Sequence, residues 1–299
     1  MVKVRTLLGM VALALTLSAA QAATLVDTDF SKGSTGWVLD QAENNAARLL
    51  DPKTAGVTQV LALTQNTGGQ TGIAWSQLKQ KVDSFSFIVD MRIRWEPTDP
   101  DGNEVNECPA DGAALIYAPV EPDAVGGGGG GVGLTGGAIE TFTAFVVNTW
   151  RGAGNGSDEE RESCKTNTKF ETFEFFVATP TYGDYERPQD GVVRTPDDGG
   201  SKINQVNPPS GMRIVNGGFY RYQWNVDGVN NTMAVYVTGL EDSNKQFQKV
   251  KVIEAKFDPA KVKLTNFEGR WGMSAATGGA VQHTEIARAR IDSPMIDPL

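Results

Sequence analysis

The sequence holds 299 residues, of which 27 are basic, 36 are acidic and one is a histidine, so its formal net charge is −9. A surface this acidic repels phosphate backbones and anionic lipid headgroups, which argues against nucleic acid and membrane surfaces as partners and is compatible with neutral sugars or cations. With a single histidine, a cysteine nucleophile activated by histidine is not expected.

The N-terminus is predicted to be a signal peptide. Lys3 and Arg5 precede an apolar run from Leu7 to Leu17, which is followed by an Ala-Gln-Ala segment. This pattern is typical of an export signal, so we expect residues 1–22 to be removed by cleavage after Ala22 and the mature chain to be secreted or periplasmic. The run is shorter than the roughly 20 residues that a membrane-spanning helix needs, so membrane insertion is not expected.

Residues 23–299 carry neither a repeat nor a linker that would divide them, so we expect a single domain. Helix signals are scarce here, whereas apolar or β-branched runs bounded by Gly, Asn, Asp and Pro are frequent. The clearest expected strands are Val57–Leu63, Ser84–Trp95, Ala113–Ala118, Phe142–Trp150, Phe170–Ala178, Phe219–Val226, Thr232–Val237, Gln248–Ala255, Trp271–Ala276 and Glu285–Ile291. Strands at this spacing predict an all-β fold, an antiparallel β-sandwich or jelly roll.

The segment Ser84–Trp95 shows the alternation of a sheet with one buried face. Apolar side chains occupy every second position from Phe85, and Asp90, Arg92 and Arg94 occupy positions between them. One dry face and one wet face are typical of an antiparallel sheet.

Two cysteines, Cys108 and Cys164, are present. Because an exported protein meets an oxidising compartment, we expect them to form a disulfide. The alternative is two unrelated thiols, one of them buried.

The first candidate binding residues are an acid and a glycine run. Asp111 stands directly before the strand Ala113–Ala118, where it either meets a ligand or braces a turn. Gly126–Gly131 is an unbroken run of six glycines. Its backbone N–H groups can approach a ligand closely because no side chain intervenes, although glycine runs also serve as flexible linkers.

Two later strands end in residues suited to the same purpose. Asn148 and Trp150 end one predicted strand, and the Trp150 ring serves either as a platform for a ligand or as part of the core. The strand Trp271–Ala276 runs into a tight turn at Gly278 and Gly279. A sugar offers paired hydroxyl groups on one edge and C–H groups on one face, which calls for an acceptor beside an aromatic ring.

These segments, in this order, resemble the L-type (legume-type) lectin family. That family shows an Ala-Asp-Gly segment before a strand, a Gly-Gly loop closing in Leu-Gly-Leu, a strand ending Phe-Asp-Thr-aromatic, and Gly-Phe-Ser-Ala-x-Thr-Gly before a His-x-Ile strand. The corresponding segments here are Ala110–Gly112, the glycines before Val132-Gly133-Leu134, Val147–Trp150, and Gly272–Gly279 with His283–Ile286. The resemblance extends over most of the chain after Phe30 and implies a concanavalin A-like jelly roll that binds carbohydrate.

The resemblance also implies a shallow sugar site built from four loops. In such a site a carboxylate accepts hydrogen bonds from sugar hydroxyls, a glycine N–H donates one, and an amide side chain does both. An aromatic ring stacks on the pyranose, and a glycine turn sets the specificity. The resemblance implies Asp111 as the carboxylate, Gly129 or Gly130 as the N–H donor and Asn148 as the amide. It implies Trp150 as the stacking ring, and Gly278 and Gly279 as the turn that sets the specificity.

The metal ligands depart from the family pattern. The family holds calcium beside a transition metal with a Glu and an Asp two residues apart, followed by Asn, Asp and His. Val146 and Asn148 stand at the first two positions here and no histidine follows in the loop, so no transition metal is expected. Oxygen ligands for calcium remain in Asn148, the Trp150 carbonyl, Asn155 and Asp158. Their reduced charge and wider spacing are as compatible with a lost calcium site as with a retained one.

We expect a binding protein rather than an enzyme. Jelly-roll glycoside hydrolases need two carboxylates roughly 5–5.5 Å apart, and Glu171 and Glu174 are at odd spacing and so face opposite sides of a strand. Jelly-roll lyases typically use a His with a Tyr and an Arg. His283 is the sole histidine and stands near the C-terminal end, which argues against a lyase. The alternative to a secreted lectin is a structural surface or matrix protein that kept the fold and lost the site. The expected partners are glycans or glycoconjugates, and the fold is compatible with a homodimer.

Overall fold

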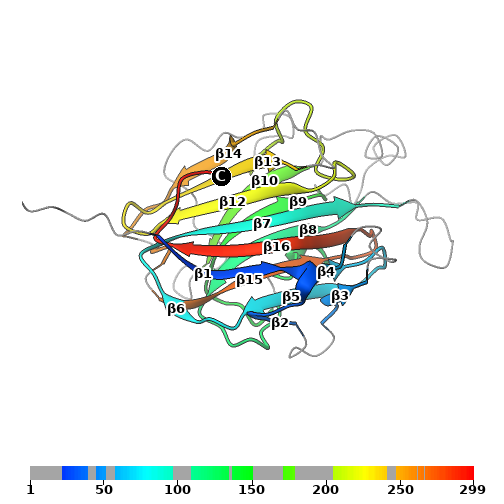
Figure 1. Cartoon of the computed structure of the whole chain (residues 1–299), viewed down its shortest axis with the longest axis horizontal. Helices are drawn as coiled ribbons and strands as arrows, with labels where there is room; N and C mark the ends of the chain where they lie inside the picture. The colour runs from blue at the N-terminus through cyan, green and yellow to red at the C-terminus, as the bar shows by residue number, and fades with distance from the viewer. Residues whose placement is uncertain are drawn as a thin grey trace, which may run out of the picture.

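A computed structural model of the chain contains two β-sheets packed face to face (Figure 1). The structure describes residues 22–39, 45–51, 58–96, 109–134, 137–150, 171–178, 205–240, 247–260, 262–265 and 267–299. The predicted signal peptide apart from Ala22, the cysteines Cys108 and Cys164, and the predicted calcium ligands Asn155 and Asp158 lie outside these ranges. Within them, no helix is long and apolar enough to cross a membrane.

The first sheet has eight strands, and all of its strand pairs are antiparallel. Their order across the sheet is β14 (Val250–Lys256), β13 (Thr232–Gly239), β12 (Tyr220–Asp227), β7 (Ser84–Arg94), β16 (His283–Ser293), β4 (Val60–Thr64) and β3 (Arg48–Leu50). The eighth strand, β1 (Ala23–Asp29), pairs with the second half of β16, whereas β4 pairs with the first few residues of β16. In Figure 1 this sheet faces the viewer.

The second sheet also has eight strands, again in antiparallel pairs. Their order is β11 (Gln205–Val206), β10 (Thr172–Ala178), β9 (Phe142–Asn148), β8 (Gly112–Ala118), β15 (Glu268–Ala276), β5 (Thr71–Ser76) and β2 (Trp37–Val38), with β6 (Gln80–Lys81) paired to the start of β15. Two short 3₁₀ turns, η1 (Phe30–Lys32) and η2 (Gly129–Gly131), are the other regular elements in the described ranges. The predicted all-β antiparallel sandwich is confirmed.

The alternation of apolar and polar side chains along β7 explains how the two sheets pack against each other. The apolar side chains from Phe85 to Ile93 point between the sheets and are almost fully buried. There the Phe85 ring contacts Trp224 and Trp271 edge to face, with centroids 5.3 and 5.6 Å apart. Such pairs contribute about 1 kcal/mol each beyond the burial of apolar area.

The outer face of the second sheet is buried as well. Its strands β5, β8 and β9 present apolar side chains that pack beneath residues 119–134 and 137–141, among them Val132 and Leu134. The Trp75 indole N–H donates to the carbonyl of Ala124 (2.8 Å) and ties this segment to β5. Because β8 is covered on both faces, its sequence reads as an apolar run without alternation. The covering segment contains the six-glycine run.

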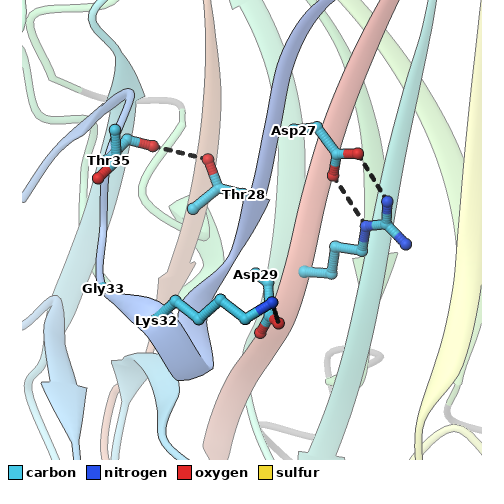
Figure 2. A pocket seen from close by; sticks show the side chains of 7 residues that line it. Asp27, Thr28, Asp29, Lys32, Gly33 and Thr35 are labelled. Atoms are coloured by element: carbon cyan, nitrogen blue, oxygen red, sulfur yellow. Dashed lines mark hydrogen bonds and ion pairs between the residues drawn. The ribbon is translucent and has the colours of Figure 1, made fainter.

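A polar pocket of about 420 Å³ lies on the first sheet, where β1 meets η1 and β16 (Figure 2). Its charged side chains pair with one another: Arg288 donates to both carboxylate oxygens of Asp27 (2.8 and 2.6 Å), and Lys32 lies 3.2 Å from Asp29. The remaining lining residues are Thr28, Gly33 and Thr35. The pocket therefore offers no unpaired charge and no aromatic ring, and none of the predicted site residues lies in it.

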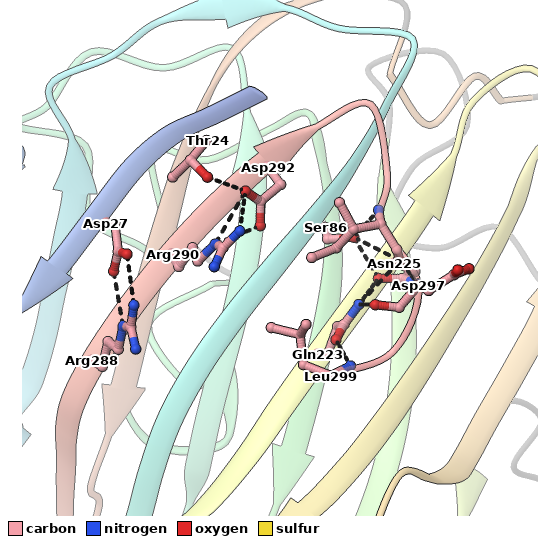
Figure 3. Close-up of polar contacts among 11 residues, drawn as sticks. Thr24, Asp27, Ser86, Gln223, Asn225, Arg288, Arg290, Asp292, Asp297 and Leu299 are labelled. Atoms are coloured by element: carbon pink, nitrogen blue, oxygen red, sulfur yellow. Dashed lines mark hydrogen bonds and ion pairs between the residues drawn. The ribbon is translucent and has the colours of Figure 1, made fainter. Parts of the chain in front are cut away.

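Residues 294–299 cross the outer face of the same sheet (Figure 3). The Ile296 N–H donates to the Ser86 hydroxyl (2.9 Å), and the Ile296 carbonyl accepts from the amide groups of Gln223 and Asn225 (both 3.2 Å). All three side chains are buried although they point away from the core. This segment therefore covers these polar side chains and also supplies hydrogen-bond partners for them, as buried polar groups require.

Candidate functional site

Asp111 is held between the ends of two strands of the second sheet. It directly precedes β8, and its N–H donates to the carbonyl of Ala276 at the end of β15 (2.9 Å). Its own carbonyl accepts from the Thr149 N–H just beyond β9 (3.1 Å). The Ala110–Asp111 peptide bond is cis. The backbone of Asp111 is thus fixed by both neighbouring strands.

The glycine run forms an ordered turn rather than a linker. The N–H of Val132 donates to the carbonyl of Gly129 (2.9 Å), and the N–H of Gly133 donates to the carbonyl of Gly127 (2.9 Å). The base of the turn is tight, because a methyl group placed on Gly126 would lie 2.3 Å from the Gly133 carbonyl oxygen. The tip is open toward the described residues, since a methyl group on Gly130 would meet none of them within 4 Å.

Three of the predicted segments meet at the carboxylate of Asp111. A methyl group placed on Gly278 would lie 3.3 Å from Asp111 Oδ2 and 3.7 Å from the Cα of Gly129. A methyl group on Gly129 would lie 3.9 Å from the same oxygen. Residues separated by more than 160 positions in the sequence therefore come into contact at one end of the second sheet. Around this contact, Gly130 and Gly279 are exposed.

The Asp111 carboxylate is buried and incompletely satisfied. The residue is only 7% exposed, and Oδ2 is shielded from solvent and accepts no hydrogen bond from the residues that the structure describes. Burial raises the pKa of Asp111 to about 6, because desolvation penalises the charged form. Bracing a turn takes only one acceptor oxygen, so that role would leave Oδ2 over as a second acceptor.

Asn148 and Trp150 lie beside this contact. Asn148 pairs with Gly112 across β8 and β9. Its Oδ1 accepts from the Trp150 N–H (2.9 Å), and its Nδ2 donates to Glu174 on β10 (3.0 Å). Trp150 is half-buried.

The part of the chain that the structure describes does not by itself fit a metal ion. It contains no group of three or more His, Cys, Asp or Glu side chains arranged to hold one. Val146, which stands where the family has a glutamate, is buried among the apolar side chains on the outer face of the second sheet. Asn148 uses both of its side-chain groups within the chain. The calcium prediction therefore depends on Asn155 and Asp158, which lie outside the described ranges.

The carboxylates considered for catalysis have other contacts. Glu171 is buried and accepts from the backbone N–H groups of Ile214 and Val215 (2.9 and 3.0 Å). Glu174 accepts from Asn148 and from the Thr172 hydroxyl (2.8 Å). Both carboxylates thus hold neighbouring backbone or side chains in place.

The sole histidine, His283, begins β16 on the other sheet. Its Nε2 lies 3.7 Å from a carboxylate oxygen of Glu96. Burial and the neighbouring Arg94 lower the pKa of His283. It therefore lies among strand residues of the first sheet and not beside Asp111.

Sequence reasoning did not single out Thr277 or the turn between β4 and β5. The buried Thr277 hydroxyl donates to the Thr67 carbonyl (2.7 Å) and accepts from the Gln70 N–H (2.9 Å). The Gly69 N–H donates to the Gly278 carbonyl (2.9 Å). A weak signal existed, since Thr277 belongs to the Ser-Ala-Ala-Thr-Gly segment that carries the family resemblance. The contact itself depends on how two turns approach each other in space.

No protein-family model matches the chain, and no curated protein matches it. Solved structures do resemble it. Basic winged bean lectin, solved with the Tn antigen, shares 17% identity at a TM-score of 0.59, and the alignment covers 91% of this chain and 98% of the lectin. The lectin from Bauhinia forficata, solved in complex with GalNAc, also shares 17% identity at a TM-score of 0.56, over 90% of this chain and 98% of the lectin.

The exoplasmic/lumenal domain of VIP36, in its Ca²⁺- and Man2-bound form, shares 13% identity at a TM-score of 0.52, over 90% of this chain and 85% of that domain. Identities this low establish the fold alone. The two packed sheets form the jelly-roll sandwich of the L-type lectins, as the sequence resemblance predicted.

Proposed function

We propose that this protein binds glycans through the end of the second sheet that carries Asp111. The observation that supports this most strongly is the buried carboxylate of Asp111, whose Oδ2 has no hydrogen-bond partner among the described residues and lies against Gly129 and Gly278. An unsatisfied buried acceptor costs free energy, which a ligand hydroxyl group would recover.

In this proposal Asp111 accepts from sugar hydroxyls and the N–H of Gly129 or Gly130 donates to the sugar. Trp150 stacks on the apolar face of the pyranose, as aromatic rings do in carbohydrate sites. Because Oδ2 is shielded from solvent, a sugar hydroxyl can reach it in this proposal only if Gly129 moves away from the carboxylate. Asn148, Gly278 and Gly279 complete the proposed site.

Calcium is a separate part of the proposal. The VIP36 domain that resembles this chain was solved with Ca²⁺ and a mannose disaccharide. If calcium binds here, Asn148, the Trp150 carbonyl, Asn155 and Asp158 would hold it through oxygen atoms, as calcium prefers. We expect it to raise the midpoint of thermal unfolding, because a ligand of the folded state stabilises that state. An unchanged midpoint between excess calcium and chelator would contradict this part.

We further propose that the chain is exported, with residues 1–22 acting as the signal peptide. N-terminal sequencing of the protein released by its host tests this, and a mature chain that begins at Ala23 is the expected result. Sedimentation of the purified protein tests the proposed homodimer.

The experiment that tests glycan binding is a glycan array probed with the wild type and with Asp111→Ala. We expect the wild type to bind a subset of neutral glycans and Asp111→Ala to lose at least tenfold in affinity for them. Asp123→Ala is the matched control, because Asp123 is an exposed acid on the segment that leads into the glycine run. If Asp111→Ala keeps every glycan contact of the wild type, the proposed site is in the wrong place.

A second candidate is a structural surface or matrix protein with the lectin fold. Two observations favour it: Asn148 satisfies its side chain within the chain, and Oδ2 of Asp111 is shielded from solvent. This candidate predicts that the folded wild-type protein binds no glycan on the array, with or without calcium.

A further inference from the structure

Thr277 joins the turn after β15 to the turn between β4 and β5. Its hydroxyl donates to the Thr67 carbonyl (2.7 Å) and accepts from the Gln70 N–H (2.9 Å). Its own N–H donates to the Gln70 carbonyl (2.8 Å). The residue is 1% exposed. One buried threonine therefore makes three hydrogen bonds to a single turn that is distant in sequence.

The contact continues into Gly278. The Gly278 carbonyl accepts from the Gly69 N–H (2.9 Å), and a methyl group placed on Gly68 would lie 2.9 Å from that same carbonyl oxygen. The two turns thus approach so closely that neither a side chain nor a water molecule fits between them at Gly68. The direction of the Gly278 peptide is set by this contact.

Gly278 in turn faces the site. Its Cα is close enough that a methyl group on it would lie 3.3 Å from Asp111 Oδ2 and 3.7 Å from Gly129. On the other side of Thr277, the carbonyl of Ala276 accepts from the Asp111 N–H (2.9 Å). Thr277 therefore lies between Ala276 and Gly278, the two residues through which the end of β15 and the turn after it contact Asp111.

We propose that Thr277 is a positioning residue for the glycan site, a role that rests on the proposed function. It holds Gly278 against the β4–β5 turn and so fixes the opening above the Asp111 carboxylate. Thr277 itself contacts no sugar in this proposal. It acts through Gly278, which sets how far a hydroxyl group can approach Oδ2.

The test compares three variants. Thr277→Val keeps the shape of the side chain and removes the hydroxyl, and Thr277→Ser restores the hydroxyl. Thr143→Val is the matched control, because the Thr143 hydroxyl is also fully buried and also donates to a backbone carbonyl, that of Leu264 (2.9 Å). Thr143 lies on β9, five residues before Asn148, and it belongs to none of the four site loops.

Two measurements separate positioning from simple destabilisation. The first is affinity for albumin conjugates of GalNAc and of mannose, measured well below the unfolding midpoint. We expect Thr277→Val to lose at least fivefold, and Thr277→Ser and Thr143→Val to stay within twofold of the wild type. The second is amide hydrogen exchange. In Thr277→Val we expect the N–H groups of Gly69, Gln70 and Gly278 to exchange at least tenfold faster, and in Thr143→Val to exchange at the wild-type rate.

The outcomes distinguish this inference from the proposed function. Unchanged exchange at Gly69 and Gly278 in Thr277→Val overturns the positioning role, whatever the glycan result. An equal loss of affinity in Thr277→Val and Thr143→Val also overturns it, because general destabilisation then explains both. If the wild type binds neither conjugate, glycan binding by these sugars fails, and the exchange measurement still decides whether Thr277 fixes the turn.

Discussion

The distances around the Asp111 carboxylate are set by residues that have no side chain. Gly129 has a φ of +58°, a conformation that residues other than glycine adopt at a cost of about 1 kcal/mol. A Cβ atom placed on Gly278 would lie 3.3 Å from Asp111 Oδ2, which is closer than an ordinary van der Waals contact. Glycine is therefore favoured at these two positions for different reasons, one conformational and one steric.

Gly278→Ala should weaken glycan binding more than it weakens the fold. The added methyl group would press on Asp111 Oδ2, so we expect at least a fivefold loss of affinity with a stability cost of about 1 kcal/mol. Gly130→Ala is the control for stability, because its methyl group meets none of the described residues within 4 Å. It should change stability by less than about 0.5 kcal/mol. Calorimetric titration measures the affinity of Gly278→Ala and urea unfolding the stability of both variants, and an equal stability cost in the two would contradict the steric argument.

The ionisation of Asp111 should make stability depend on pH. Its folded pKa, about 6, lies above its ordinary value of 3.8, so the folded state holds the proton more tightly than the unfolded state does. This favourable contribution is fully present below pH 3.8 and is lost as pH rises to about 6. Asp111→Asn cannot ionise and escapes that loss.

We therefore expect Asp111→Asn to be more stable than the wild type at pH 7.5, by on the order of 1–2 kcal/mol once partial contact with solvent is allowed for. The gap should close near pH 4. Urea unfolding in the presence of chelator measures it, with Asp123→Asn as the exposed control. A gap that stays constant between pH 4 and pH 7.5 would show that Asp111 ionises freely in the folded protein.

At the scale of elements, β7 and β16 are joined by charge as well as by backbone pairing. Glu285 on β16 is fully buried and accepts from Arg92 and from Arg94 Nη2 (2.8 Å) on β7. Burial acts to raise the pKa of Glu285, but the two guanidinium groups outweigh it and lower the pKa below its ordinary value. The carboxylate thus stays charged inside the sheet because two cations flank it.

Glu285→Gln should destabilise the sandwich strongly. It removes the buried charge that faces Arg92 and Arg94, although Arg94 keeps its bond to Glu96, and breaking a buried pair typically costs about 3–5 kcal/mol. Glu254→Gln is the control, because Glu254 pairs with Lys251 on the exposed edge strand β14 and such pairs contribute less than about 1 kcal/mol. Urea unfolding at neutral pH compares the two variants. Equal unfolding midpoints would mean that the buried pair contributes no more than the exposed one.

Ten strands were predictable from the sequence, and the others, including the seven-residue β1 and the six-residue β5, were not. Each of the ten expected strands is present, with ends shifted by up to three residues, because each buries at least one face and shows it in its pattern. The prediction missed β1, whose residues are mostly exposed or half-buried and whose place is decided by pairing with β16. It also missed β5, where Gly72 packs directly against the backbone of Leu63 on β4.

The candidate site was predictable only in part. The resemblance placed Asp111, Gly129 and Gly278 in one site, and the structure brings these three into contact. The contacts of Thr277 with the β4–β5 turn had no signal of their own, because hydrogen bonds to backbone atoms leave little trace in side-chain identity. The bond from Asn148 to Glu174 depends on the register of β9 against β10, which no pattern in either strand specifies.

At the scale of the whole molecule, the first sheet carries a surface of paired charges. Its outer face joins Asp90 to Arg221 (2.7 Å), Asp27 to Arg288 (2.6 Å) and Arg290 to Asp292 (2.8 Å). Pairing of this kind leaves little net charge on the described part of that face. The binding surface proposed here belongs to the other sheet, so a partner that covers the first sheet would leave the Asp111 site open.

The predicted disulfide would act on the site through the whole fold. A bridge between Cys108 and Cys164 would enclose β8, η2 and β9, and with them Asp111, the glycine run and Trp150. In the chain-entropy model, closing a loop of this length stabilises the folded state by about 4 kcal/mol. For a chain of this size each kcal/mol shifts the unfolding midpoint by about 2–4 °C.

We therefore expect replacement of both cysteines by serine to lower the midpoint by roughly 10 °C in calorimetry. Treating the wild type with a reductant should produce a similar fall, whereas the same reductant should leave the double variant unchanged. This pairing of genetic and chemical removal separates the lost bridge from any effect of serine itself. Two reactive thiols per chain in the unfolded, oxidised wild type would show that Cys108 and Cys164 are not joined, and the segments around Asp111 would then be held by strand pairing alone.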